Sequence, residues 1–177
     1  MSVLSSCAVK VLEDPAREFD ELFTANYSRL ARLFRRVVGD AGQAEELAAE
    51  AFWKLHRKPP PSDHNLLGWL YRTGLRLALD SLKKQKLRAH YEALAAVPRT
   101  GQDLQEALER HERRHRVRQV LAALKREHAA LLLLRSEGFT LSELAAILKL
   151  SPGSVGTFLA RAEVAFRKEY VDRYGEP

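Results

Sequence analysis

Residues 138–168 constrain the fold of this chain most, because they contain the start signals of two helices separated by a turn. Thr140 and Glu143 have the spacing of a capping box, in which the Thr hydroxyl accepts a hydrogen bond from a free backbone N–H and the Glu carboxylate returns to the N–H of the cap. Ser151 and Pro152 mark a second start, since proline at the first helical position lacks an N–H that would have no partner there. We therefore expect two short helices joined by a tight turn, the first beginning directly after Thr140.

The second of these helices has two unlike faces. Its buried seam recurs at helical spacing and comprises Val155, Leu159, Ala162 and Phe166. The opposite face is small and carries one cation; it comprises Gly153, Gly156, Thr157, Ala160, Arg161 and Val164. Such a face suits a helix in the major groove of DNA, where Thr157 and Arg161 can reach base edges or phosphates. The alternative is a helical hairpin that packs on another domain.

Cationic residues gather in one stretch of the chain. The 177-residue chain has a net charge of +6, and residues 69–88 contain six cations and one anion, a local charge of +5. Three of the cations project along one line of a helix with Trp69 beside them, a combination that fits single-stranded DNA, since a base stacks on the ring while the cations neutralise phosphates. A solvated basic face is the alternative. The basic set comprises Arg72, Arg76, Lys83, Lys84 and Lys86.

Helical periodicity also covers the N-terminal half. Apolar residues at helical spacing predict helices over about 15–39, 43–57 and 66–87. The loop Lys58–Asn65 separates the last two, because its three consecutive prolines fix φ and remove backbone donors. In the helix 43–57, Trp53 lies away from the apolar stripe and beside acidic residues. An exposed Trp of this kind is a candidate protein-binding anchor, and cover by a neighbouring loop is the alternative.

These patterns predict an all-α protein of two small helical domains joined by a linker. The expected organisation is an N-terminal tail over 1–15, a helical bundle over 16–88, a linker and charged lead-in helix over 89–116, a helix-turn-helix domain over 117–170 and a C-terminal tail over 171–177. The single cysteine excludes an internal disulfide. No basic n-region and no apolar stretch long enough for a membrane span are found, so we expect a cytoplasmic protein.

One literal motif points to a different class of protein. His111-Glu112-Arg113-Arg114-His115 matches H-E-x-x-H, the helical zinc site of metallohydrolases. The motif lies in a stretch that is charged nearly all round, whereas such a site excludes water, and no third ligand is indicated. No other catalytic constellation is found, so we expect neither an enzyme nor a cofactor.

The order and spacing of these segments resemble the sigma-70 family of bacterial transcription initiation factors, in its small two-domain extracytoplasmic-function group. Residues 19–55 look like the first helices and the core-polymerase-binding segment of region 2, and residues 68–84 look like the promoter-melting helix. Residues 123–166 are similar to region 4. The resemblance covers about 19–88 and 117–170. It implies no cofactor and no catalysis by the protein itself.

The resemblance also implies partners and site residues. The helix 43–57 would dock on the clamp helices of the largest subunit of core RNA polymerase, and the flap and an anti-sigma factor are further expected partners. The implied polymerase-binding residues are Glu46, Leu47, Glu50, Phe52 and Trp53. Melted promoter DNA would bind Asn65 of the loop, Trp69 and the basic set. Duplex promoter DNA would be read by Ser151, Ser154, Thr157, Phe158 and Arg161.

The chain departs from the family pattern at several positions. Ala49 stands where Gln is usual, Arg76 where Asn is usual and Lys125 where a Leu-Pro pair is usual. The expected recognition helix lacks most of the usual polar and basic residues, and the helical phase places Phe158 at the buried seam. Two other functions therefore stay open. One is a sigma-like decoy or adaptor that binds an anti-sigma factor or polymerase without reading DNA, and the other is a plain helix-turn-helix regulator.

Overall fold

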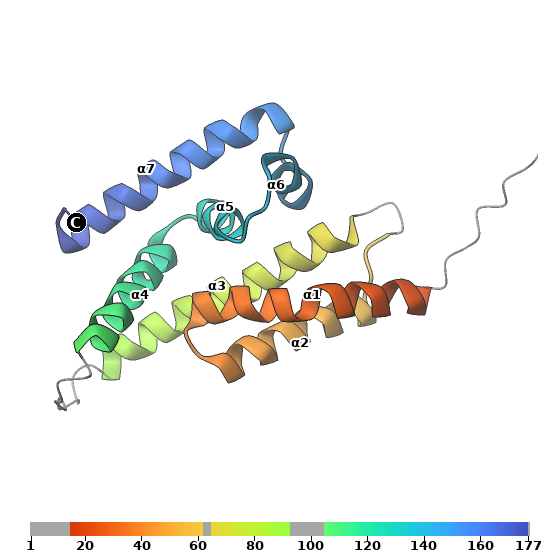
Figure 1. Cartoon of the computed structure of the whole chain (residues 1–177), viewed down its shortest axis with the longest axis horizontal. Coiled ribbons are helices and arrows are strands. Elements are labelled where there is room, and N and C mark those ends of the chain that lie inside the picture. Colours follow the sequence, from red (N-terminus) through yellow and green to blue (C-terminus); the bar gives the residue numbers. More distant parts are fainter. Residues whose placement is uncertain (1–14, 62–64, 93–104, 177) are drawn as a thin grey trace, which may run out of the picture.

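The computed structural model describes residues 15–61, 65–92 and 105–176, and in these residues the chain is helical and contains no strand (Figure 1). The all-α prediction is confirmed. Helices α1, α2 and α3 form one unit, and α4 to α7 form a second unit that lies along one side of the first. The bounds are α1 (Pro15–Val38), α2 (Ala41–Arg57), α3 (Leu66–Glu92), α4 (Gln105–Ala123), α5 (Arg126–Ser136), α6 (Leu141–Leu148), the 3-10 helix η2 (Pro152–Ser154) and α7 (Val155–Tyr174).

The first unit is a bundle in which each helix contacts the other two. Its centre is apolar and almost fully buried, with Phe34 of α1 and Leu75 of α3 among the largest side chains. Gly74 lets α3 approach α1 closely, because a Cβ there would lie 2.4 Å from the Phe34 ring. Between α1 and α2 the chain turns at Gly39, whose φ of 85° favours glycine. The Asp40 side chain then caps α2 by accepting a hydrogen bond from Gln43 N at 2.7 Å.

The second unit contains the two-helix element expected from residues 138–168. Thr140 caps α6, and Thr140 and Glu143 form the predicted capping box, with Thr140 N–H donating to the Glu143 carboxylate at 2.7 Å. Lys149 ends α6 in the left-handed conformation at φ 57°. Pro152 then opens the short η2, and α7 follows. The predicted turn between two helices is therefore confirmed.

The two units share one continuous apolar cluster, because α3 lies against α4, α5 and α6. Phe139, which precedes α6, is the centre of this junction. Its ring meets the Tyr71 ring edge to face at a centroid distance of 5.0 Å, and the Arg29 guanidinium lies 4.0 Å above it. The carboxylate of Glu137, close to Phe139 in the chain, pairs with Arg36, and the Glu137 backbone carbonyl accepts a hydrogen bond from the Arg29 guanidinium. The junction thus combines an apolar centre with charged contacts at its edge.

Tyr71 differs from the other residues of the junction in the hydrogen bonding of its side chain. Its side chain is fully buried, and its hydroxyl has no hydrogen-bond partner among the described residues. Burial raises the pKa of this hydroxyl above its usual value, with a smaller opposing contribution from the charge of Arg29. A buried polar group without a partner costs about 1–3 kcal/mol. The contact between the two units is therefore weaker than its apolar area suggests.

The helices extend across several boundaries expected from the sequence. α3 continues to Glu92, beyond the expected end of the bundle at residue 88, and α4 runs through the expected boundary between residues 116 and 117. The terminal helix ends at Tyr174 and not near residue 170. The expected N-terminal tail with Cys7, residues 62–64 of the proline loop and residues 93–104 of the linker lie outside the described residues. No described helix is long and apolar enough to span a bilayer.

Candidate nucleic-acid interface

A cavity of about 720 Å³ lies where α2, the proline loop and α3 meet. The C-terminal end of α2 supplies Trp53, the start of α3 supplies Trp69, and residues 58–61 of the loop line one side. Lys149, at the end of α6, reaches the cavity from the second unit. The described residues that line the cavity are Trp53, Lys54, Arg57, Lys58, Pro59, Pro60, Pro61, Trp69, Thr73, Arg76 and Lys149.

The cavity is strongly cationic. Five of its lining residues carry a positive charge and none is acidic. Within the described residues, Lys54 is the lining cation that pairs with a carboxylate, since its Nζ lies 3.2 Å from a Glu50 oxygen of α2. The Arg57 guanidinium lies over the Trp53 ring at 5.1 Å, which fixes the ring next to a cation. The electrostatic potential of such a cavity attracts anions.

The two tryptophans give the cavity flat apolar surfaces. The Trp53 side chain is 54% exposed, which is a large exposed area for this residue type. Trp69 is half-buried and packs against the core of the bundle. An aromatic ring beside several cations is the arrangement that binds single strands, in which bases stack and phosphates pair with Lys or Arg. The geometry therefore suits an unpaired nucleotide.

The predicted basic set lies along α3, where Arg76 also lines the cavity, and its members differ in exposure. Arg76, Lys83 and Lys84 are exposed, and Lys86 lies in α3 with a side chain outside the described residues. Arg72 differs, because its guanidinium donates to the backbone carbonyl of Ile147 in α6. Burial lowers the pKa of Arg72 from its usual value. In this arrangement Arg72 holds α6 against α3 and is half-buried, whereas Arg76, Lys83 and Lys84 are exposed.

Asn65 also has a structural role. Its side-chain oxygen accepts a hydrogen bond from Gly68 N at 2.8 Å, and its backbone oxygen accepts one from Trp69 N at 2.9 Å. The residue thus caps the start of α3 and orients the first turn, which carries Trp69. Its side chain remains exposed.

The second predicted DNA-binding surface is the outer face of α7. Thr157 and Arg161 are exposed, and Val164 on the same face is 69% exposed. Ser151 and Ser154 lie at the start of this face with their hydroxyl oxygens 2.5 Å apart. Phe158 is half-buried and packs against the core, as the helical phase predicted. A Cβ added to Gly153 or Gly156 would meet nothing within 4 Å, so internal packing does not require glycine at either position.

The structure corrects the predicted polymerase-binding set in one residue. Phe52 is only 2% exposed, and its ring packs against Phe23 at a centroid distance of 4.9 Å. Phe52 therefore stabilises the bundle and cannot be part of a docking surface. Glu46 and Glu50 are exposed on α2, and Leu47 is half-buried. Trp53 continues this surface at its far end and also lines the cationic cavity.

Several cavity residues were not among the predicted site residues. Lys54 and Arg57 lie on the same helical turns as Trp53, and their position relative to Trp53 was a usable signal. Lys149 could not have been found in this way, because it reaches the cavity only through the contact between α3 and α6.

The H-E-x-x-H motif lies on α4, where the side chains of His111 and His115 are exposed. In the described residues no group of three side chains is placed to hold a metal ion.

The comparisons with known proteins agree with this geometry. Residues 22–88, which span most of α1 to α3, match the family model of Sigma-70 region 2. This segment belongs to the sigma-70 family. The cationic cavity and both tryptophans lie within sigma region 2, apart from the contribution of Lys149. None of the curated proteins compared with the sequence matches it.

A solved structure shows the same fold over nearly the whole chain. It is the co-crystal structure of the sigma factor RpoE in complex with the anti-sigma factor NepR from Bartonella quintana. The match has a TM-score of 0.51 at 16% sequence identity and covers 86% of this chain and 96% of that chain. The similarity therefore extends beyond sigma region 2 and includes the second unit.

Proposed function

We propose that the protein is a sigma factor of the extracytoplasmic-function group, which binds core RNA polymerase, directs it to a promoter and holds the melted strand. The observation that carries this proposal is the cavity that sigma region 2 lines with two tryptophans and four cations, with Lys149 of the second unit as the fifth cation. Such a cavity has no role in stabilising a three-helix bundle. It matches the requirements of an unstacked base and its flanking phosphates.

Three surfaces divide the work in this proposal. Bases of the melted strand stack on Trp69 and Trp53, while Arg76, Lys83 and Lys84 neutralise the phosphates along α3. The outer face of α7 lies in the major groove of the distal promoter element, where Thr157 and Arg161 contact base edges or phosphates. The small residues of this face, Gly153 and Gly156 included, let the helix backbone approach the DNA. Glu46 and Glu50 on α2 contact the polymerase.

Transcription by the reconstituted holoenzyme tests the proposal. The full chain is added to sigma-free core RNA polymerase with a library of genomic fragments, and the RNA 5′ ends are sequenced. We expect starts at a small set of sites that share two sequence elements. Binding to the core enzyme without a start on any fragment would contradict promoter recognition, and no binding to core would contradict the proposal as a whole.

A decoy or adaptor is the second candidate, and a specific observation favours it. Arg72 is tied to Ile147, and the Lys149 side chain lines the cavity that the melted strand would enter. A protein that kept this closed arrangement would bind polymerase or an anti-sigma factor without engaging DNA. The salt dependence of duplex binding separates the two candidates. A slope of log K against log salt that is indistinguishable from zero favours the decoy, since each neutralised phosphate contributes about −0.9.

A further inference from the structure

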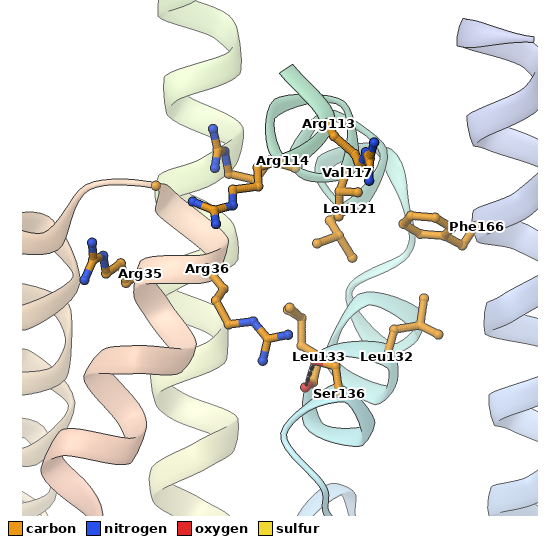
Figure 2. Close-up of a pocket in the computed structure, with 12 residues that line it drawn as sticks. Arg35, Arg36, Arg113, Arg114, Val117, Leu121, Leu132, Leu133, Ser136 and Phe166 are labelled. Atoms are coloured by element: carbon orange, nitrogen blue, oxygen red, sulfur yellow. Dashed lines mark hydrogen bonds between the residues drawn. The ribbon is translucent and has the colours of Figure 1, made fainter. Parts of the chain in front are cut away.

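A second cavity, far from the tryptophan site, lies at the opposite end of the junction between the two units. Its volume is about 820 Å³. The end of α1 lines one side of it, α4 and α5 line two more, and Phe166 of α7 closes the fourth (Figure 2). Its lining residues are Arg35, Arg36, Gly39, Arg113, Arg114, Val117, Arg118, Leu121, Leu132, Leu133, Ser136 and Phe166.

Positive charge dominates the rim of this cavity. Five arginines line it, and none of its lining residues is acidic. Arg36 pairs with Glu137 just outside the lining, and Figure 2 shows it extending from α1 towards Leu133 and Ser136 of α5. The Arg118 guanidinium lies against the Gly39 backbone, where a Cβ would approach it to 3.0 Å. Burial, and then the charge of Arg114, lower the pKa of Arg118, which indicates that these cations repel one another.

The walls between the arginines are apolar. Val117 and Leu121 project from α4, Leu132 and Leu133 belong to α5, and Phe166 reaches in from α7. Leu121 and Leu133 are buried, while Val117, Leu132 and Phe166 are half-buried at the cavity surface. A water-filled cavity with such walls is unfavourable compared with one that holds an apolar group. The arginines and the apolar walls therefore favour different parts of one ligand.

We propose that this cavity binds a small anionic amphiphile, a molecule with a phosphate or carboxylate head and an apolar body, free in solution. The guanidinium groups bind the head, because their planar donors match phosphate and carboxylate oxygens in pairs. The body packs on Leu121, Leu132 and Phe166. The volume lies within the range of about 300–1,000 Å³ that is typical of small-molecule sites. A peptide helix is about 10–12 Å wide with its side chains, so three turns of it exceed this space.

Because the cavity lies between the two units, a bound ligand would affect the contact between them. α1 belongs to the first unit, and α4, α5 and α7 belong to the second, so a ligand that contacts both adds attraction across the junction. This is the junction at which Tyr71 is buried without a partner. A ligand that binds only the packed arrangement stabilises it by mass action. The amphiphile therefore favours the arrangement in which Arg72 contacts Ile147.

Calorimetry with dodecyl phosphate below its micellar concentration tests the site in the full chain. We expect one site, an affinity at least about tenfold above that of inorganic phosphate, and no comparable site for dodecyltrimethylammonium. Arg35→Gln with Arg114→Gln should weaken the binding by about tenfold or more, since both arginines are exposed and the fold does not depend on them. Arg167→Gln is the matched control, because Arg167 is an exposed cation of α7 that does not line the cavity.

Methyl NMR spectra locate the ligand independently of the variants. Dodecyl phosphate should shift the methyl signals of Leu121, Leu132 and Leu133 before any others. Equal affinity for inorganic phosphate, equal loss in Arg167→Gln or first shifts elsewhere would each overturn the proposal. Co-sedimentation of the chain with phosphatidylglycerol vesicles at the same lipid concentration would also overturn it, in favour of a membrane surface. None of these outcomes depends on transcription, so they are independent of the sigma-factor proposal.

Discussion

The two candidate DNA-binding surfaces of this protein differ in almost every physical respect. The cavity of α2 and α3 is concave, contains two tryptophans and is lined by five cations. The outer face at the start of α7 carries small residues and Arg161, and the Cβ positions of Gly153 and Gly156 beside it are open. The first surface offers charge and stacking, and the second offers a close approach of backbone.

Under the proposed function, the two surfaces suit two different forms of DNA, a single strand and an intact duplex. Stacking on tryptophan needs a base that has left the duplex, and it tolerates any base because each has a π-face. A small helix face suits an intact major groove, in which base edges present a sequence-specific pattern of donors and acceptors. The chain would then hold one strand through the first surface by general forces and select a sequence through the second with few contacts.

Replacement of Trp53 by Ala gives the largest expected effect and tests whether this residue belongs to the cavity or to a polymerase contact. We expect the affinity for a single-stranded oligonucleotide to fall by about 1–3 kcal/mol, roughly 5- to 150-fold, because one stacking surface is lost. Fluorescence anisotropy with a labelled strand measures it. Val164→Ala is the control, since it truncates an exposed apolar side chain on α7, outside the cavity.

The same variant can contradict the assignment of the cavity. If Trp53→Ala binds the single strand like the wild type but loses affinity for core polymerase, then Trp53 acts as the protein-binding anchor that the sequence suggested. The stacking role would then rest on Trp69 alone. Duplex binding should stay unchanged in either case, because α7 does not contribute to the cavity.

Salt dependence sharpens the comparison between the two surfaces. Arg76→Gln should make the slope of log K against log salt for the single strand shallower by about 0.7 and leave the duplex slope unchanged. Arg161→Gln should change the duplex slope by about 0.9 and leave the single-strand slope unchanged. Either change corresponds to about a five- to eightfold difference in affinity over a tenfold change in salt. Equal effects of both variants on both ligands would show that the two surfaces do not act separately.

The sequence predicted local structure well where the signal lay within one helix or turn. The capping box of Thr140 and Glu143, the proline turn before α7 and the seam position of Phe158 each depend on neighbours a few residues away, and the structure confirms all three. The exposure of Arg76 and Lys83 likewise follows from helical phase within α3.

The sequence could not predict what depends on contact between distant helices. Arg72 and Arg76 lie one helical turn apart on the same side of α3. Arg72 nevertheless donates a hydrogen bond to the backbone carbonyl of Ile147, because α6 packs at that end of α3. Lys149 joins the tryptophan cavity for the same reason. The family resemblance assigns Phe52 to the polymerase-binding surface, whereas its position in the apolar stripe of α2 predicts the buried site that it occupies.

Loss of the α6 cap tests how far the α7 surface depends on local structure. Thr140→Ala should lower the free energy of unfolding by about 1 kcal/mol, because the Thr hydroxyl no longer accepts from Glu143 N. Duplex binding should fall with it, since α6 precedes η2 and α7, while single-strand binding should stay unchanged. Urea denaturation and the two binding assays measure these effects. A parallel loss of single-strand binding would indicate that the two units act as one body.

The same cap makes a prediction for pH. Hydrogen bonds from the Thr140 N–H, and then from its hydroxyl, hold the pKa of Glu143 below its ordinary value of 4.5. A carboxyl whose pKa is depressed in the folded state contributes stability above the unfolded-state pKa, and this contribution is lost as the pH falls through the folded-state pKa. The acid loss of stability should therefore be smaller in Glu143→Gln than in the wild type. Equal acid profiles would contradict the capping role.

The smallest expected effect comes from Gly156→Ala, and it separates stability from recognition on α7. Alanine should stabilise the helix by about 0.5 kcal/mol, because Gly156 has no positive φ and the added Cβ meets nothing within 4 Å. If the face lies in the major groove, the same methyl group keeps the backbone away from DNA, so duplex affinity should fall although the protein is more stable. A change that raises stability and lowers affinity cannot arise from damage to the fold. Unchanged duplex affinity together with the gain in stability would show that the α7 face does not approach DNA closely.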